Sequence, residues 1–306
     1  MVSEKYLKEL FDPDLPIVSS KLLSLSGLSE TEVAKFREFW EQAPVERRIQ
    51  LHEELITIAE DTPEADFDAI FRVALDDETP EARSKAIEGL WECRERWLLN
   101  RLITMALEDP ASFVRGSAAS ALEKFVKLSV FEELRPALAE KVETTLRGII
   151  ANTQEDPLVR ARAIEALSPS IGPDVNDIIR AAYHSQEPHM KLSALYAMGQ
   201  HSDEGWLPVL LTEIKNSDPI LRFEAAHACG ELGDERAVPS LVELARDEDE
   251  QVQEAAIEAL GRIGGDTARR ALRQYLAQPD ERVQEAARAA LEELALNDDP
   301  LGFSPS

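Results

Sequence analysis

Histidine is the residue type in this chain best suited to metal binding or proton transfer, because its imidazole titrates near neutral pH. Of the five histidines, His184 and His189 flank a turn that also contains Glu187. Zinc needs three or four ligands in a rigid shell, and a short turn does not supply one. We therefore interpret these histidines as ordinary turn residues and predict no metal site.

Catalytic motifs are absent from the sequence. It contains no glycine-rich phosphate loop, no nucleophile elbow, no His-Glu-x-x-His and no Cys-x-x-Cys. Cys93 and Cys229 form no disulfide framework, which suits a reducing cytosol. We therefore predict no catalytic residue and no cofactor.

Basic or amide side chains, called anchors below, recur along the chain and could bind anions as a row. Successive anchors are 32, 45, 31, 31, 31 and 31 residues apart, and an alanine follows three residues after each of them. The anchors are Arg83, Arg115, Arg160, Lys191, Arg222, Gln253 and Gln284.

The alanines predict helices that pack closely. Positions three, four and seven residues apart lie on one helical face. Alanine on that face lets two backbones approach, whereas a larger side chain would cost roughly 1–3 kcal/mol. An N-cap oxygen before a proline predicts where such helices begin, at Thr79-Pro80, Asp156-Pro157 and Asp218-Pro219.

Two helices, a short turn and an alanine-rich second helix opened by Asp-Pro-x-x-Arg resemble the HEAT repeat. The 31-residue period and the segment from Gly233 to Pro239 are most similar to the short variant named after phycobilisome lyases. This resemblance implies an all-α fold, a right-handed α-solenoid of about eight HEAT-like helical hairpins. It also implies that the anchors pair with acidic loop groups of adjacent repeats, for which Asp156, Glu187 and Asp218 are suitably placed.

The period also divides the chain. An irregular insertion is expected at about residues 124–155, where the anchor spacing lengthens to 45, with a helix from Pro136 to about Ala151. The insertion is either a hinge or a packed elaboration. The predicted parts are an N-terminal lead-in with a capping helix, the HEAT-like array, and a disordered tail, at residues 1–43, 44–296 and 297–306.

The chain is strongly acidic, with 59 Asp and Glu against 33 Lys and Arg and a net charge of -26. Such a surface repels phosphate backbones and anionic lipids, so we expect neither nucleic acid nor membrane as a partner. It favours basic partners, or simply solubility. No apolar run approaches a membrane span and the N-terminus lacks an apolar signal core, so we expect a cytoplasmic protein.

A candidate binding surface emerges where repeats differ at positions that the fold does not fix. One and five residues past the anchor most repeats carry small or acidic residues, but two adjacent repeats carry apolar and aromatic ones. Exposed aromatic clusters are typical of interfaces. The alternative is that Leu192 and Phe223 only pack between repeats. The predicted partner-binding residues, on a concave inner face, are Leu192, Tyr196, Trp206, Phe223 and His227, with Glu165 and Glu258 at the rim.

We therefore expect a non-enzymatic scaffold or adaptor that holds a protein or peptide, basic or with exposed apolar residues, on a concave acidic surface. The resemblance leaves an alternative, a bilin-lyase-type enzyme or a subunit of an enzyme complex, although no local motif for a tetrapyrrole is present. Deoxyhypusine hydroxylases bind two irons through repeated His-Glu pairs, and this chain has one such pair, His52-Glu53. HEAT-like DNA glycosylases use a basic face, which the negative charge argues against.

Overall fold

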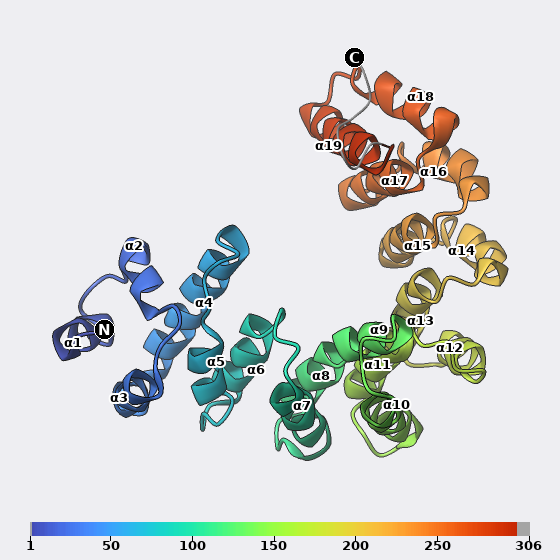
Figure 1. The fold of residues 1–306 in the computed structure, drawn as a ribbon. Coiled ribbons are helices and arrows are strands. Elements are labelled where there is room, and N and C mark those ends of the chain that lie inside the picture. Colours follow the sequence, from blue (N-terminus) through green and yellow to red (C-terminus); the bar gives the residue numbers. More distant parts are fainter. Residues whose placement is uncertain (1, 299–306) are drawn as a thin grey trace. The chain divides into compact units, whose positions relative to one another are not determined.

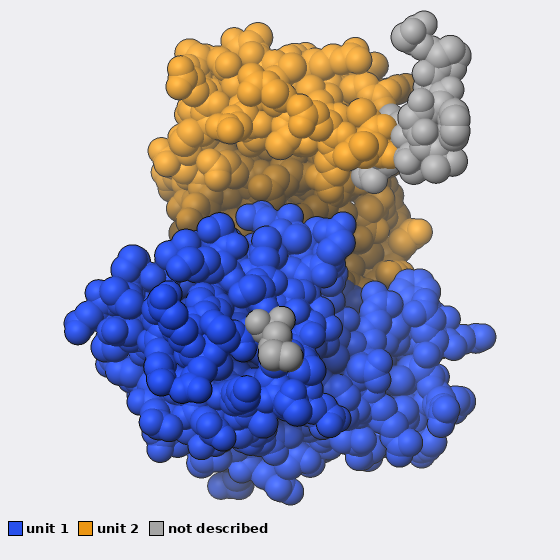
Figure 2. All heavy atoms as spheres, turned by 60° about the vertical axis from the view of Figure 1, so that its left-hand side comes forward, with its two compact units in different colours: residues 1–166 blue, residues 167–306 orange. Residues whose placement is uncertain are grey.

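The computed structural model describes residues 2–298, and within this range every element of secondary structure is helical (Figure 1). The chain forms two compact units, Met1–Ala166 and Leu167–Ser306, coloured separately in Figure 2 and called unit 1 and unit 2. Each unit is a stack of helical hairpins, which confirms the predicted all-α solenoid class. Within residues 2–298, no helix combines the length and the apolar character needed to span a membrane.

Unit 1 begins with a lead-in of short helices and continues as hairpins. The second helices of successive hairpins, α4, α6 and α8, pack against one another. A capping box opens α3, because Ser29 and Glu32 bond reciprocally. Its elements are α1 (Glu4–Leu10), α2 (Ser19–Leu22), η1 (Leu23–Leu25), α3 (Glu30–Trp40), α4 (Val45–Asp61), α5 (Asp68–Ala74), α6 (Pro80–Gly89), α7 (Arg96–Glu108), α8 (Ser112–Ala121), α9 (Glu123–Val130), α10 (Pro136–Ala151) and α11 (Pro157–Leu167).

Unit 2 is the regular part of the array. The second helices α13, α15, α17 and α19 pack in succession on one side, and the first helices of the hairpins lie on the other (Figure 1). Its elements are α12 (Val175–Tyr183), α13 (Pro188–Gln200), η2 (Glu204–Trp206), α14 (Leu207–Glu213), α15 (Pro219–Leu232), η3 (Glu235–Ala237), α16 (Val238–Leu244), α17 (Glu250–Ile263), α18 (Gly265–Tyr275) and α19 (Glu281–Asp298).

The alanine face is buried, as its spacing predicts. Every alanine three residues past an anchor is fully buried, so these side chains lie where second helices meet. Cys229, which the repeat places in a core position, is also fully buried. The seven alanines are Ala86, Ala118, Ala163, Ala194, Ala225, Ala256 and Ala287.

Most of the charged anchors tie their own hairpin to the next one. Arg222 donates to the carbonyl oxygens of Asn216 and Ser217 at 2.9 and 3.1 Å, which closes the turn of its own hairpin. Its other two donors bind the carboxylate of Asp247 in the next repeat, both at 2.8 Å. Gln253 keeps only the turn contact, at 2.5 Å from the carbonyl oxygen of Asp247. The structural role of the anchors is therefore confirmed.

The anchors pair with acidic groups of adjacent repeats, as the resemblance implied, but the acids differ from those suggested. Arg222 pairs with Asp247, and Asp218 instead caps its own helix by accepting from the amide of Ile220 at 3.0 Å. Lys191 pairs with Glu213 at 3.0 Å. These anchors therefore reach the acid of the turn in the next repeat. Other corresponding pairs are Arg48–Asp77, Arg83–Asp109 and Arg115–Glu155.

Three local predictions need correction or completion. Thr79 does not cap α6, because its hydroxyl accepts from Arg48 at 3.2 Å. The helix expected from Pro136 is confirmed as α10, but the insertion also contains α9, which was not predicted and packs on α8 and α10. Residues 297 and 298, predicted to be disordered, belong to α19. The rest of the predicted tail lies outside the described residues.

Candidate partner-binding surfaces

The exposed face of the second helices in unit 2 is continuous. Four side chains nine residues past successive anchors link one helix to the next. Gln200 donates to the Glu231 carboxylate at 3.0 Å, and Arg262 donates to the same carboxylate at 2.7 Å. Arg262 also lies 3.8 Å from Glu293. Residues 31 apart therefore face the same side of the stack across α13, α15, α17 and α19.

The structure brings four of the predicted residues onto this face. Residues five and one past an anchor lie one and two turns before this row, respectively, because a spacing of four keeps side chains on one face. Leu192 and Tyr196 on α13 and His227 on α15 are half-buried, and Phe223 is 38% exposed. These four residues are called the aromatic patch below. Ile220, one turn before Phe223 and more exposed than it, was missed from the sequence.

Trp206 does not belong to the aromatic patch. It lies in η2, at the start of the first helix of its hairpin, and only 6% of its surface is exposed. The guanidinium of Arg180 on α12 covers its ring at 5.5 Å from the ring centroid. A large apolar ring in this slot is buried between neighbouring first helices, so we withdraw Trp206 as a partner-binding residue.

The two predicted rim residues differ in their surroundings. Glu258 on α17 is exposed and occupies the same offset from its anchor as Tyr196 and His227. Glu165 belongs to α11 in unit 1, where it pairs with Arg162 at 2.7 Å. The acidic neighbours of the aromatic patch within unit 2 are therefore Glu258 and other glutamates of α17 and α19.

The surroundings of His227 lower the pKa of its imidazole and so favour the neutral form. Burial lowers its pKa, and the nearby Arg262 guanidinium lowers it further, against the opposing effects of Glu231 and Glu258. A neutral imidazole offers one donor and one acceptor without adding charge. A neutral His227 therefore adds hydrogen-bonding capacity to the aromatic patch without adding charge.

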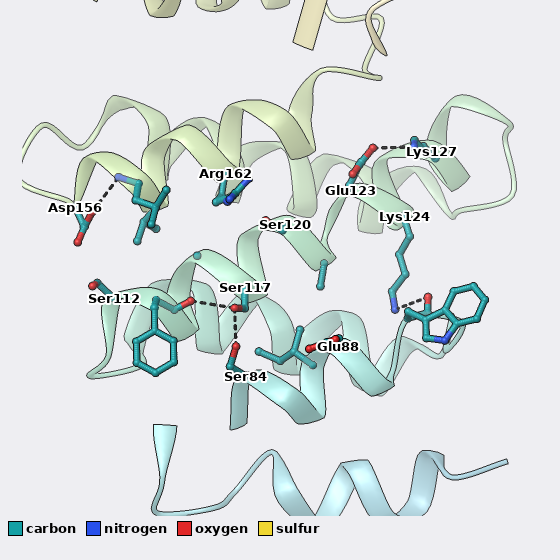
Figure 3. A pocket seen from close by; sticks show the side chains of 17 residues that line it. Ser84, Glu88, Ser112, Ser117, Ser120, Glu123, Lys124, Lys127, Asp156 and Arg162 are labelled. Atoms are coloured by element: carbon teal, nitrogen blue, oxygen red, sulfur yellow. Dashed lines mark hydrogen bonds and ion pairs between the residues drawn. The ribbon is translucent and has the colours of Figure 1, made fainter. Parts of the chain in front are cut away.

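Unit 1 contains a groove that the sequence did not reveal, called the α6–α11 groove (Figure 3). It has a volume of about 660 Å³ and is lined by residues of α6, α8, α9 and α11 and of the loops beside them. Three large apolar side chains are exposed around it: Trp91 at 51%, Phe113 at 43% and Leu158 at 37%. This volume lies within the range typical of ligand sites.

The groove was missed for two reasons. One wall is α9, which lies outside the repeat, so comparison between repeats says nothing about it. The other is that Ser84, Gly116 and Ser120 occupy the variable offsets with small side chains, which look unremarkable in a sequence. The available signal was the combination of these small residues with Trp91 and Phe113 at the ends of their helices.

The histidines considered for metal binding lie apart from both surfaces. His52 is fully buried between Trp40 and Phe71, with ring centroids 4.8 and 5.5 Å away. His184 lies in the turn before α13 and His189 in the first turn of that helix, and both are exposed. In the described part of the chain, no three His, Cys, Asp or Glu side chains gather closely enough to hold a metal ion.

Comparison with protein families identifies the repeat. Residues 207–292 match the family of HEAT repeats, and this part of the chain therefore consists of HEAT repeats. The match covers α14 to α19, the most regular hairpins. The closer likeness to the phycobilisome-lyase variant stays a prediction. Comparison with curated protein sequences gave no match.

Solved structures with similar folds belong to diverse proteins. Human deoxyhypusine hydroxylase in complex with glycerol is 19% identical, over 87% of this chain and 96% of that chain, with a TM-score of 0.38. YibA from Escherichia coli is 16% identical, over 96% and 98% of the two chains, with a TM-score of 0.43. The karyopherin Kap121p bound to Nup53p is 13% identical, over 96% and 38%, with a TM-score of 0.44.

Proposed function

We propose that this protein is a non-enzymatic scaffold that binds a basic peptide or protein segment with exposed apolar side chains. The binding surface is the second-helix face of unit 2. The observation that carries the proposal is the placement of Leu192, Tyr196, Phe223 and His227 on one continuous, solvent-facing side of neighbouring helices. Aromatic side chains in such positions are frequent anchors of protein interfaces.

The charge beside the aromatic patch selects the partner. Glu258 on α17 and Glu285 on α19 are exposed, and neither forms an ion pair within the described residues. Glu254, in contrast, forms an ion pair with Arg282 at 3.4 Å. Lysine or arginine side chains of a partner would therefore meet uncompensated carboxylates next to the apolar contacts. Complementary charge raises the association rate and makes binding sensitive to salt.

A peptide library displayed on phage and selected on the full chain tests this proposal. We expect enriched sequences to combine aromatic or aliphatic residues with Lys or Arg. Binding of such a peptide should weaken with added salt and fall roughly tenfold or more in the Tyr196→Ala, Phe223→Ala double variant.

Leu276→Ala provides a matched control. Leu276 is as exposed as Phe223, at 38%, but it lies at the end of α18, a first helix. Its replacement should leave peptide affinity unchanged. Equal losses in the control and the double variant would contradict the proposal, as would a chromophore that co-purifies with the protein, which would favour a bilin-lyase-type enzyme.

A further inference from the structure

The α6–α11 groove in unit 1 has the chemistry of a second docking site. Trp91, Phe113 and Leu158 come from three different segments and expose large apolar surfaces around one depression. Apolar side chains gathered in this way mark binding sites more often than isolated exposed residues do. The groove lies wholly in unit 1, so it is formed by residues other than those of the aromatic patch.

Small side chains keep the groove open at positions where the corresponding residues of unit 2 have large side chains. Ser84, Gly116 and Ser120 stand at the offsets that carry large side chains in the aromatic patch. A methyl group on Gly116 would meet only Arg162 and Val159, at 3.8 and 4.0 Å, which is ordinary van der Waals contact. Packing therefore does not require glycine here, although alanine would be the stronger helix former. Gly116 weakens α8 although no neighbouring atom requires a glycine there. We therefore interpret the space beside Gly116 as room for a bound molecule.

Lys124 is the charged group of the groove that lacks an ionic partner. Its ammonium donates to the carbonyl oxygens of Leu90 and Trp91 at 2.6 and 3.3 Å, and no carboxylate in the described part of the chain forms an ion pair with it. Burial lowers the pKa of Lys124 to about 8, against the opposing effects of Cys93 and Asp68. A poorly hydrated cation gains from an incoming anion.

The other cations that line the groove already have carboxylate partners. Lys127 pairs with Glu123 at 2.7 Å, and Glu88 pairs with Lys85 at 2.9 Å. Arg162 pairs with Glu165, and Asp156 caps α11 through the amide of Leu158 at 2.9 Å. Figure 3 shows Asp156 and Lys124 at opposite ends of the groove. Among the cations that line the groove, the ammonium of Lys124 is therefore the one that an anionic occupant can neutralise.

The hydroxyl groups along the floor favour a peptide over a hydrocarbon chain. Ser117 donates its hydrogen to the carbonyl oxygen of Phe113 at 3.0 Å, so the 2.8 Å contact between Ser84 and Ser117 has Ser84 as its donor. The oxygen of Ser84 thus remains an acceptor at the groove. A peptide backbone supplies N–H donors for it, and an alkyl chain does not.

We propose that the α6–α11 groove binds a peptide segment that carries at least two large apolar side chains and, at one end of them, a carboxylate. The apolar side chains pack on Phe113, Leu158 and Trp91, and the carboxylate accepts a hydrogen bond from the ammonium of Lys124. This acidic, apolar segment differs in charge from the basic segment proposed for unit 2. The two sites can therefore be tested, and can fail, independently.

The test uses the full chain with Tyr196→Ala and Phe223→Ala, so that the aromatic patch does not select peptides. Phage-displayed peptides enriched on this protein should share apolar residues next to Asp, Glu or a free carboxyl terminus. Affinity of a synthetic enriched peptide, measured by fluorescence anisotropy, should fall roughly tenfold with Lys124→Met. Lys127→Met is the matched control, because Lys127 lies on the same helix and lines the same groove but is neutralised by Glu123; it should change affinity less than about twofold.

Replacement of the peptide carboxylate by an amide leaves the protein untouched and guards against misfolding of the Lys124 variant. It should cost as much as Lys124→Met, and the two changes together should cost no more than either alone. Enriched peptides without an acidic group would overturn the proposal. So would equal losses with Lys124→Met and Lys127→Met, or displacement of every selected peptide by dodecanoate, which would indicate a lipid site.

Discussion

Gly199 on α13 and Ala228 on α15 are in direct backbone contact: a methyl group on Gly199 would lie 2.8 Å from the Cα of Ala228. The same relationship recurs one period later and again after that, at Gly230 with Ala259 and at Gly261 with Ala290. The distance between second helices in unit 2 is therefore set by glycine on one helix and alanine on the next. This contact explains why the repeat demands small residues.

Gly199→Ala should destabilise the protein, because the added methyl group must push α13 and α15 apart. We expect a loss of about 1–3 kcal/mol in the free energy of unfolding, measured by urea denaturation. Gly148→Ala is the control, since no atom lies within 4 Å of an added methyl group there. It should stabilise α10 by about 0.5–1 kcal/mol. Destabilisation of the same size by both changes would show that close approach is not the cause.

Ala225→Leu tests the alanine face directly. Ala225 is fully buried between second helices, so a leucine would overpack the contact by three carbon atoms. The melting temperature should fall markedly, in line with a cost of about 1–3 kcal/mol. Ala289→Leu on α19 is the control, because Ala289 is exposed. An unchanged melting temperature for Ala225→Leu would mean that this face does not pack as described.

Arg222 offers a test of the anchors. Burial alone would raise the pKa of Asp247, but hydrogen bonds from Arg222 and from the amide of Asp249 hold it below its usual range. Arg222→Met should cost about 2–3 kcal/mol in unfolding free energy, because it leaves a half-buried carboxylate and two carbonyl groups without their partner. Arg222→Gln should cost less, because glutamine keeps the turn contact, as Gln253 does. If the two variants lost the same unfolding free energy, the ion pair with Asp247 alone would account for the loss.

The 31-residue period predicted the features that recur in every repeat, but it could not predict features that occur only once. The alanine spacing correctly predicted the buried face of the second helices. Comparison of equivalent offsets placed Phe223 and Tyr196 on the opposite face, because residues at the same offset lie on the same side of their helices. Trp206 was misplaced because a ring in place of an alanine can be buried by its neighbours as readily as exposed. The groove depends on α9, which no other repeat matches. Sequence comparison between repeats carries no information about such an element.

His52 is buried without a hydrogen-bond partner for either ring nitrogen, between the rings of Trp40 and Phe71. Burial lowers its pKa to about 3, an effect that Asp77 opposes and that Lys85 and Arg48 reinforce. In the unfolded chain its pKa is close to 6.5. His52 is therefore neutral in the folded protein near neutral pH.

Below about pH 6.5 the unfolded chain binds a proton at His52 and the folded chain does not, so the stability of the fold should fall as the pH falls. The slope attributable to this group is up to about 1.4 kcal/mol per pH unit. Urea denaturation between about pH 6.5 and 5, above the range in which most carboxylates protonate, should show a shallower slope for His52→Leu than for the unaltered protein. His189→Gln, at an exposed site, should leave the slope unchanged. If His52→Leu and the unaltered protein lose stability in parallel, His52 is already protonated in the fold and its assignment as a neutral core residue is wrong.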